Sequence, residues 1–223
     1  MIRTITFLIL ALTTAHAQTS SVVSKKFLAL GDSYTIGESV PEKERWPEQL
    51  AEILRAKGEK IEKPRIIAVT GWRTDQLKKA IEEAQLKNEY DLVSLLIGVN
   101  NQYQNKLVEG YALEFEELLL MAVGLAKGKK ENVFVVSIPD YGFTPFGKSK
   151  QPEISKAIDR YNDVNRELTT RKGIKYINIT DLTRQGLENP EYVAGDGLHP
   201  SGKMYALWAE RVVTSLNISK QGK

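Results

Sequence analysis

Asp-Leu-Val-Ser-Leu-Leu-Ile, residues 91–97, is a short and almost continuous apolar run that leads directly into Gly98-Val99-Asn100-Asn101. A strand whose two faces are both covered has this pattern, whereas a strand with one wet face alternates apolar and polar residues. The run therefore predicts a central strand of a parallel sheet that is packed between helices.

Other short apolar runs alternate with longer helical patterns on both sides of this segment. We expect strands at 27–30, 66–69, 132–138 and 174–179, and helices at 46–57, 74–86, 108–127, 155–172 and 201–216. Strict alternation of this kind predicts one α/β domain with a parallel sheet and helices on both faces. Ligands of such sheets bind beyond the carboxyl ends of the strands, so the residues just after each strand are the candidates for chemistry.

The composition excludes several classes of protein. The chain has 223 residues, 31 Lys and Arg against 28 Asp and Glu, and no cysteine. This length fits one medium domain. Without cysteine there is no thiolate nucleophile, no cysteine-based zinc finger and no iron–sulfur cluster. The formal net charge of +3 is small and dispersed, which argues against a nucleic-acid partner.

The N-terminal segment Met1–Ala17 reads MIRTITFLILALTTAHA, with one basic residue, an apolar core and a small-x-small end at Ala15-His16-Ala17. We interpret it as a cleaved signal peptide, because the apolar run is far shorter than the roughly 20 residues that span a bilayer. The expected mature domain is 18–223, exported to the periplasm or the medium, without stable membrane insertion. Its single histidine would be His199, which argues against a catalytic zinc, and we expect no cofactor.

Ser33 lies between two glycines in Gly31-Asp32-Ser33-Tyr34-Thr35-Ile36-Gly37, directly after the first predicted strand. A strand-to-helix turn here would expose the serine hydroxyl and direct its backbone N–H toward a substrate. Gly-Asp-Ser is also common in ordinary turns, so this stretch alone is weak evidence for a nucleophile.

His199 is the candidate base, since an imidazole has an ordinary pKa near ~6.5 and can accept a proton at neutral pH. It follows Asp196 by three residues in Asp196-Gly197-Leu198-His199-Pro200. That spacing lets the carboxylate bind Nδ1 and leaves Nε2 for Ser33. The alternative is a capped loop that leads into the last helix with Ser201 as N-cap, and both descriptions can hold together.

Together with Thr70-Gly71-Trp72 and Gly98-Val99-Asn100-Asn101, these segments resemble the four diagnostic blocks of the SGNH hydrolases, also called the GDSL lipase/esterase family. The resemblance covers essentially the whole mature chain, with the blocks in the family's order. It implies a flavodoxin-like three-layer α/β/α fold with a five-stranded parallel sheet of order 2-1-3-4-5. Tyr34 stands where a leucine is common, and Asn101 stands where many members have aspartate.

In that strand order, the loops after the first three strands are neighbours. The N–H groups of Ser33 and Gly71 and the side-chain amide of Asn100 can then converge on one oxygen as an oxyanion hole. Taken singly, Gly71 can be a turn glycine and Asn100 a loop residue that bonds its own backbone. The aromatic residues that follow the strands can line an acyl or sugar pocket or pack in the core: Trp72, Tyr103, Phe143 and Phe146.

These residues predict a serine hydrolase that cleaves carboxylic esters through an acyl-enzyme. Ser33 would attack, His199 would move the proton, and Asp196 would orient His199. Short-chain acyl or acetyl esters, on small molecules or polysaccharides, are the expected substrates. Two alternatives remain: an acyltransferase of the same fold, and an inactive protein that binds carbohydrate or lipid. The sequence leaves the oligomeric state open.

Overall fold

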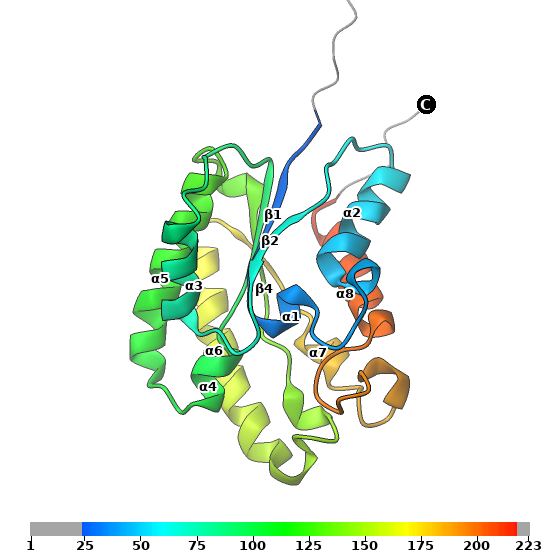
Figure 1. Ribbon diagram of the computed structural model, residues 1–223. Coiled ribbons are helices and arrows are strands. Elements are labelled where there is room, and N and C mark those ends of the chain that lie inside the picture. The colour runs from blue at the N-terminus through cyan, green and yellow to red at the C-terminus, as the bar shows by residue number, and fades with distance from the viewer. Residues whose placement is uncertain (1–23, 218–223) are drawn as a thin grey trace, which may run out of the picture.

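The computed structural model describes residues 24–217, which form a five-stranded parallel sheet flanked by helices (Figure 1). The strand order is β2-β1-β3-β4-β5. The bounds are Phe27–Gly31 for β1, Arg65–Ala68 for β2, Leu92–Leu96 for β3, Val133–Val136 for β4 and Lys175–Ile177 for β5. This arrangement confirms the predicted fold class and strand order.

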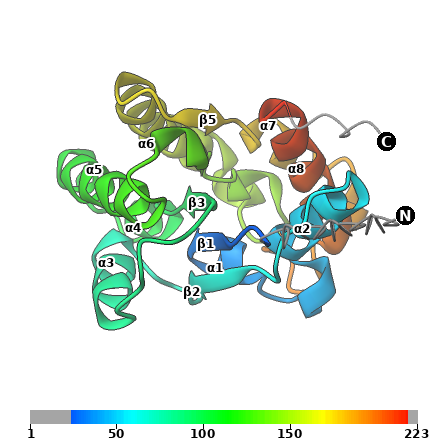
Figure 2. The same cartoon turned by 90° about the horizontal axis from the view of Figure 1, so that it is seen from above.

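Two layers of helices enclose the sheet (Figures 1 and 2). One face carries α3 (Thr74–Glu83), α5 (Val108–Leu125) and α6 (Gln151–Arg171), and the other carries α2 (Trp46–Ala56) and α8 (Gly202–Ser215). Short helices follow the strand ends: α1 (Ser33–Ile36), α4 (Val99–Tyr103) and α7 (Thr180–Thr183). Single 3₁₀ turns lie at Glu42–Glu44, Lys130–Asn132, Tyr141–Phe143, Lys148–Lys150 and Pro190–Tyr192.

The central strands are buried along nearly their whole length, which is why the run at 91–97 has so few polar residues. Every residue of β1 and β4 is buried, whereas the edge strands β2 and β5 are partly exposed. Phe27 of β1 and Phe134 of β4 pack against Trp46 of α2. The centroid of each phenylalanine ring lies 6.3 Å from that of the Trp46 ring.

Helix ends differ from the predictions by a few residues, for local reasons. Helix α6 begins at Gln151 instead of 155, with a proline in its first turn, where a missing N–H costs nothing. Ser201 caps α8 as expected, accepting from the Met204 N–H at 3.4 Å. The predicted 74–86 helix begins at Thr74 but ends at Glu83, and its N-cap is Arg73. The N–H of Thr74 donates to Asn101 Oδ1 at 3.1 Å.

Part of the predicted organisation lies outside the described residues. The signal peptide at 1–17, and with it the boundary at residue 18, stays a prediction. Between residues 24 and 217, no helix is both long enough and apolar enough to cross a membrane.

Candidate active site

A cavity of about 190 Å³ lies at the carboxyl ends of β1, β2 and β3. Ser33, Gly71, Asn100 and His199 all line it, although they come from four distant segments of the chain. The other lining residues are Tyr34, Thr70, Val99, Tyr103, Tyr141, Phe146 and Leu198. The structure thus brings the predicted nucleophile, base and oxyanion donors to one cavity.

The turn that carries Ser33 is tight. Asp32 caps α1 by accepting from the Tyr34 N–H at 3.0 Å, and Gly37 ends the helix in the left-handed conformation at φ 70°. A Cβ at Gly31 would lie 2.5 Å from the Leu96 carbonyl oxygen, so no side chain fits there. Ser33 begins α1 just beyond the carboxyl end of β1, where it lines the cavity.

His199 and Asp196 form a bonded pair. Nδ1 of His199 lies 2.6 Å from Oδ2 of Asp196, while Oδ1 accepts the backbone N–H groups of Leu198 at 2.9 Å and His199 at 3.0 Å. With Nδ1 as the donor, Nε2 carries the free lone pair that a base requires. The ring of Tyr34 packs against the imidazole, with a centroid distance of 5.5 Å.

The environment keeps Asp196 ionised. Partial burial raises the pKa of its carboxyl, but the hydrogen bonds from Ser39, the His199 ring and two backbone N–H groups outweigh burial and hold the pKa well below its usual value. A charged Asp196 is the form that stabilises an imidazolium during proton transfer.

The candidate oxyanion donors Gly71 and Asn100 lie in two linked segments, the loop after β2 and helix α4. Gly71 has φ 87°, a conformation that favours glycine, and its N–H has no partner among residues 24–217. Asn100 lies in α4, whose start needs Gly98 at φ 130°, because a Cβ there would lie 2.6 Å from the Tyr111 hydroxyl. The Asn100 amide donates one N–H to the Trp72 carbonyl at 2.9 Å.

Asn101 braces the same region as an amide. It is almost fully buried, its Oδ1 accepts from the Thr74 N–H, and its Nδ2 donates to the Thr74 hydroxyl at 2.6 Å. That hydroxyl donates in turn to the Glu114 carboxylate. An ionised aspartate could only accept, so asparagine is the residue that fits this chain of bonds.

Two neighbours of the candidate triad were not singled out from the sequence. The Ser39 hydroxyl donates to Oδ2 of Asp196 at 2.7 Å across 157 residues of chain, and Glu38 accepts from the Thr70 hydroxyl. No spacing pattern points to either contact.

Asp32 is fully buried, and this burial raises the pKa of its carboxyl to about 7. The hydrogen bond from the Tyr34 N–H lowers the pKa but does not offset burial.

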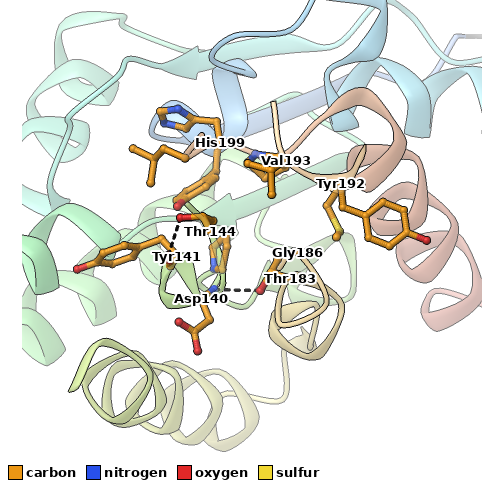
Figure 3. A pocket seen from close by; sticks show the side chains of 13 residues that line it. Asp140, Tyr141, Thr144, Thr183, Gly186, Tyr192, Val193 and His199 are labelled. Carbon is orange, nitrogen blue, oxygen red and sulfur yellow. Dashed lines mark hydrogen bonds between the residues drawn. The ribbon is translucent and has the colours of Figure 1, made fainter. Parts of the chain in front are cut away.

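A second, much smaller cavity is also lined by His199 (Figure 3). Its volume is about 20 Å³, room for one water at most, and Tyr141, Thr144 and Thr183 line it with His199. Thr183 accepts from the Asp140 N–H at 3.0 Å, which holds this wall in place. This space is too small for an organic ligand, so the larger cavity is the candidate binding site.

Three aromatic rings wall the larger cavity. The centroids of Tyr103, Tyr141 and Phe146 lie 6.1 to 6.3 Å apart, and Tyr103 and Phe146 are about half exposed. Of the four aromatic residues expected near a pocket, these two line it, whereas Trp72 packs on the core and Phe143 does not line the cavity. Within residues 24–217, no cluster of three or more metal-binding side chains of the His, Cys, Asp or Glu type occurs.

Comparisons with known proteins agree with this fold. The model of the GDSL-like lipase/acylhydrolase family matches residues 29–207. A Bacillus subtilis protein described as uncharacterized, YpmR, is 26% identical over 209 residues, covering 87% of this chain and 81% of that protein.

The similar solved structures share the fold at low identity. They include TesA, with a TM-score of 0.68 and 14% identity over 86% of this chain and 98% of that one. The acetylxylan esterase Axe2 of Geobacillus stearothermophilus has a TM-score of 0.69 and 19% identity over 89% of this chain and 97% of that one. The esterase EstA of a Pseudoalteromonas species has a TM-score of 0.62 and 16% identity over 87% of this chain and 97% of that one.

Proposed function

Because the chain belongs to the GDSL-like lipase/acylhydrolase family, we propose that it hydrolyses carboxylic esters with Ser33 as nucleophile. The observation that carries the proposal is the meeting of Ser33, Gly71, Asn100 and His199 at one cavity, with Asp196 bonded behind the imidazole. A serine, a base, a group that orients the base and a set of N–H donors are the parts that acyl transfer needs.

In the first half of the reaction, Ser33 Oγ attacks the ester carbonyl carbon and passes its proton to Nε2 of His199. The carbonyl oxygen becomes an oxyanion and accepts from the Ser33 and Gly71 N–H groups and the free N–H of the Asn100 amide. When the intermediate collapses, the imidazolium protonates the leaving alcohol and an acyl-serine ester remains. Asp196 keeps Nδ1 protonated throughout.

In the second half, a water molecule takes the place of the alcohol. His199 removes its proton, the hydroxide adds to the acyl carbon, and the second intermediate uses the same donors. Collapse returns the proton to Ser33 and releases the carboxylic acid. Oxyanion donors contribute through charge that develops only in the transition state, so they raise kcat more than they lower KM.

The substrate proposal is a short-chain acyl or acetyl ester. A volume of about 190 Å³ lies below the 300–1,000 Å³ typical of sites for drug-sized ligands, and the aromatic wall limits its length. Beyond that wall lies a more polar cavity of about 480 Å³, lined among others by Gln102, Lys150 and Arg160. A polar alcohol, such as a sugar on a small molecule or polysaccharide, suits that side. One protein with the same fold, Axe2, is named an acetylxylan esterase.

A labelling experiment tests the proposed function. A fluorophosphonate probe should modify Ser33 in the wild type and fail to modify Ser33→Ala, whose kcat should fall by about 10⁴–10⁶. A panel of p-nitrophenyl esters from acetate to decanoate, with acetylated xylan and a lysophospholipid, should show the highest kcat/KM for short acyl groups.

The alternatives give different outcomes. Folded wild type that is not labelled at pH 8 would favour a binding protein. If an added alcohol captured most of the acyl group in place of water, the chain would be an acyltransferase.

We also propose export, because residues 1–17 have the pattern of a signal peptide. N-terminal sequencing of the secreted protein should begin at Gln18, and an intact Met1 on the secreted form would contradict cleavage.

A further inference from the structure

The segment Gly37–Ser39, just after α1, contacts all three parts of the candidate site. The N–H groups of Gly37 and Glu38 both donate to the Ser33 carbonyl at 3.0 Å. The Glu38 carboxylate accepts from the hydroxyl of Thr70, the residue before Gly71. Ser39 donates to Asp196. One short loop therefore connects the nucleophile turn, the oxyanion loop and the acid–base pair.

The contact of Ser39 completes the bonding of the Asp196 carboxylate. Oδ2 accepts from the Ser39 hydroxyl at 2.7 Å and from His199 Nδ1 at 2.6 Å, and Oδ1 accepts from two backbone N–H groups. A carboxylate offers about four acceptor positions, so each is occupied. The carboxylate cannot rotate without breaking one of these hydrogen bonds. The four bonds therefore fix the orientation of the carboxylate, and through it the orientation of the His199 ring.

Ser39 makes this contact from a backbone conformation that serine disfavours. Its φ is 64°, in the left-handed region, where glycine fits without strain. Glycine at this exposed position would relieve the strain but would lack the hydroxyl. Strained residues that persist although an easier one exists are found most often at functional sites.

We propose that Ser39 is a positioning residue of the hydrolytic site, whose hydroxyl holds the Asp196 carboxylate so that His199 presents Nε2 to Ser33. The inference rests on the proposed ester hydrolysis and adds a fourth side chain to its acid–base relay. Ser39 itself does not touch the reacting atoms.

The hydroxyl has two separable effects. It fixes the orientation of the pair, and it withdraws part of the negative charge that Asp196 would otherwise direct at His199. Its removal should therefore lower kcat and, because the bare carboxylate stabilises an imidazolium better, move the acid limb of the pH profile to higher pH.

The shift of the acid limb reports on the Asp196–His199 pair, because the substitution of Ser39 leaves the other titratable groups around His199 unchanged. Tyr34, Asp140, Tyr141 and Tyr192 line the cavities next to the imidazole, and Asp140 is paired with Arg184 at 2.9 Å. Among the described residues none of them forms a hydrogen bond with Ser39, whose hydroxyl is bonded to Asp196, so a change at Ser39 reaches His199 through Asp196.

The test compares Ser39→Ala and Ser39→Gly on p-nitrophenyl acetate. Both should lower kcat about tenfold, the equivalent of one charge-assisted hydrogen bond, with KM unchanged and the acid limb at higher pH. Ser39→Gly should nevertheless melt at or above the temperature of Ser39→Ala, because it relieves the left-handed backbone. Loss of activity without loss of stability is the signature of positioning, whereas a structural role would make activity follow the melting temperature.

Two controls complete the test. Gln85→Gly, at an exposed left-handed residue far from the site, should raise the melting temperature and leave kcat unchanged. In an Asp196→Asn background, Ser39→Ala should cost less than twofold, since its target has lost its charge.

The proposal and the proposed function fail in different ways. Wild type without esterase activity and without Ser33 labelling would overturn the function. If the wild type is active and both Ser39 variants keep its kcat and its acid limb, only the role of Ser39 is overturned. The same holds if Ser39→Ala lowers kcat by the same factor in the Asp196→Asn background as in the wild type.

Discussion

The side-chain amide of Asn100 donates a hydrogen bond to the Trp72 carbonyl at 2.9 Å, so helix α4, which follows β3, is bonded to the loop after β2. Trp72 follows Gly71, whose N–H is the other candidate donor on this side of the cavity. A primary amide has two N–H groups, so one can fix the loop while the other remains for a ligand. The distance between the Gly71 N–H and the free N–H of the Asn100 amide thus depends on the Asn100 side chain.

We expect Asn100→Ala to lower kcat about 10²–10³-fold with little change in KM, because the amide would act on charge that appears in the transition state. Asn100→Asp, which is nearly isosteric but cannot donate when ionised, should be at least as harmful. Steady-state kinetics with p-nitrophenyl acetate measure both variants. A rise in KM alone would make the amide a ground-state binder.

Activity should fall toward acidic pH, because an imidazolium cannot accept the serine proton. The hydrogen bonds of Asp196 hold its pKa well below the ordinary value despite partial burial, so loss of that charge comes only at more acidic pH. Stability linked to Asp196 is likewise present above its unfolded pKa and lost as pH falls through its folded pKa. A kcat/KM profile with parallel circular dichroism checks this, and a flat profile to pH 4 would exclude His199 as the base.

Asp32 should make the fold less stable at high pH, opposite to the usual effect of a carboxylate. Burial raises the pKa of Asp32 from 3.8 to about 7, so the folded state holds its proton more tightly than the unfolded state. Stability from this group is greatest below about pH 4 and declines as pH rises through 7, by at most about 4 kcal/mol. Asp32→Asn should therefore gain stability over wild type between pH 4.5 and 8.5, measured by urea unfolding.

Asp75→Asn is the matched control for this measurement. Burial raises the pKa of Asp75, but its bond to Arg73 outweighs burial and lowers the pKa overall, so its variant should lose stability relative to wild type as pH rises. If Asp32→Asn and wild type differed by the same free energy at both pH values, the buried carboxyl would not titrate as described.

Removal of a ring from the aromatic wall should lengthen the preferred acyl chain. Phe146→Ala opens the cavity on the side of the half-exposed rings, so the ratio of kcat/KM for decanoate to that for acetate should rise about tenfold. Leu113→Ala removes an exposed apolar side chain on α5, away from the cavity, and should leave the ratio unchanged. An unchanged ratio in Phe146→Ala would show that the wall does not set acyl length.

Much of the fold could be predicted because its signals are local. The apolar run at 91–97 reflects the burial of β3 itself, and the order of strands and helices follows from alternating patterns that each span a few residues. Gly31 and Gly98 are required where the backbone approaches neighbouring atoms closely, and both lie beside residues that the motifs had already marked. Helix ends were less predictable, since α6 begins at Gln151, before the predicted start at 155, and α3 ends at Glu83, before the predicted end at 86.

The sequence by itself determined the fold class, the strand order through its family resemblance, and the short segments that meet at the cavity. Only the tertiary structure decided how these segments hold one another. The bond of Ser39 to Asp196, the brace of Asn101 on Thr74 and the burial of Asp32 join or enclose groups that no periodicity relates. Hydrogen bonds of this kind depend on ångström-scale positions that packing of the whole sheet and its helices creates, whereas hydrophobic patterning depends only on which side of an element faces the core.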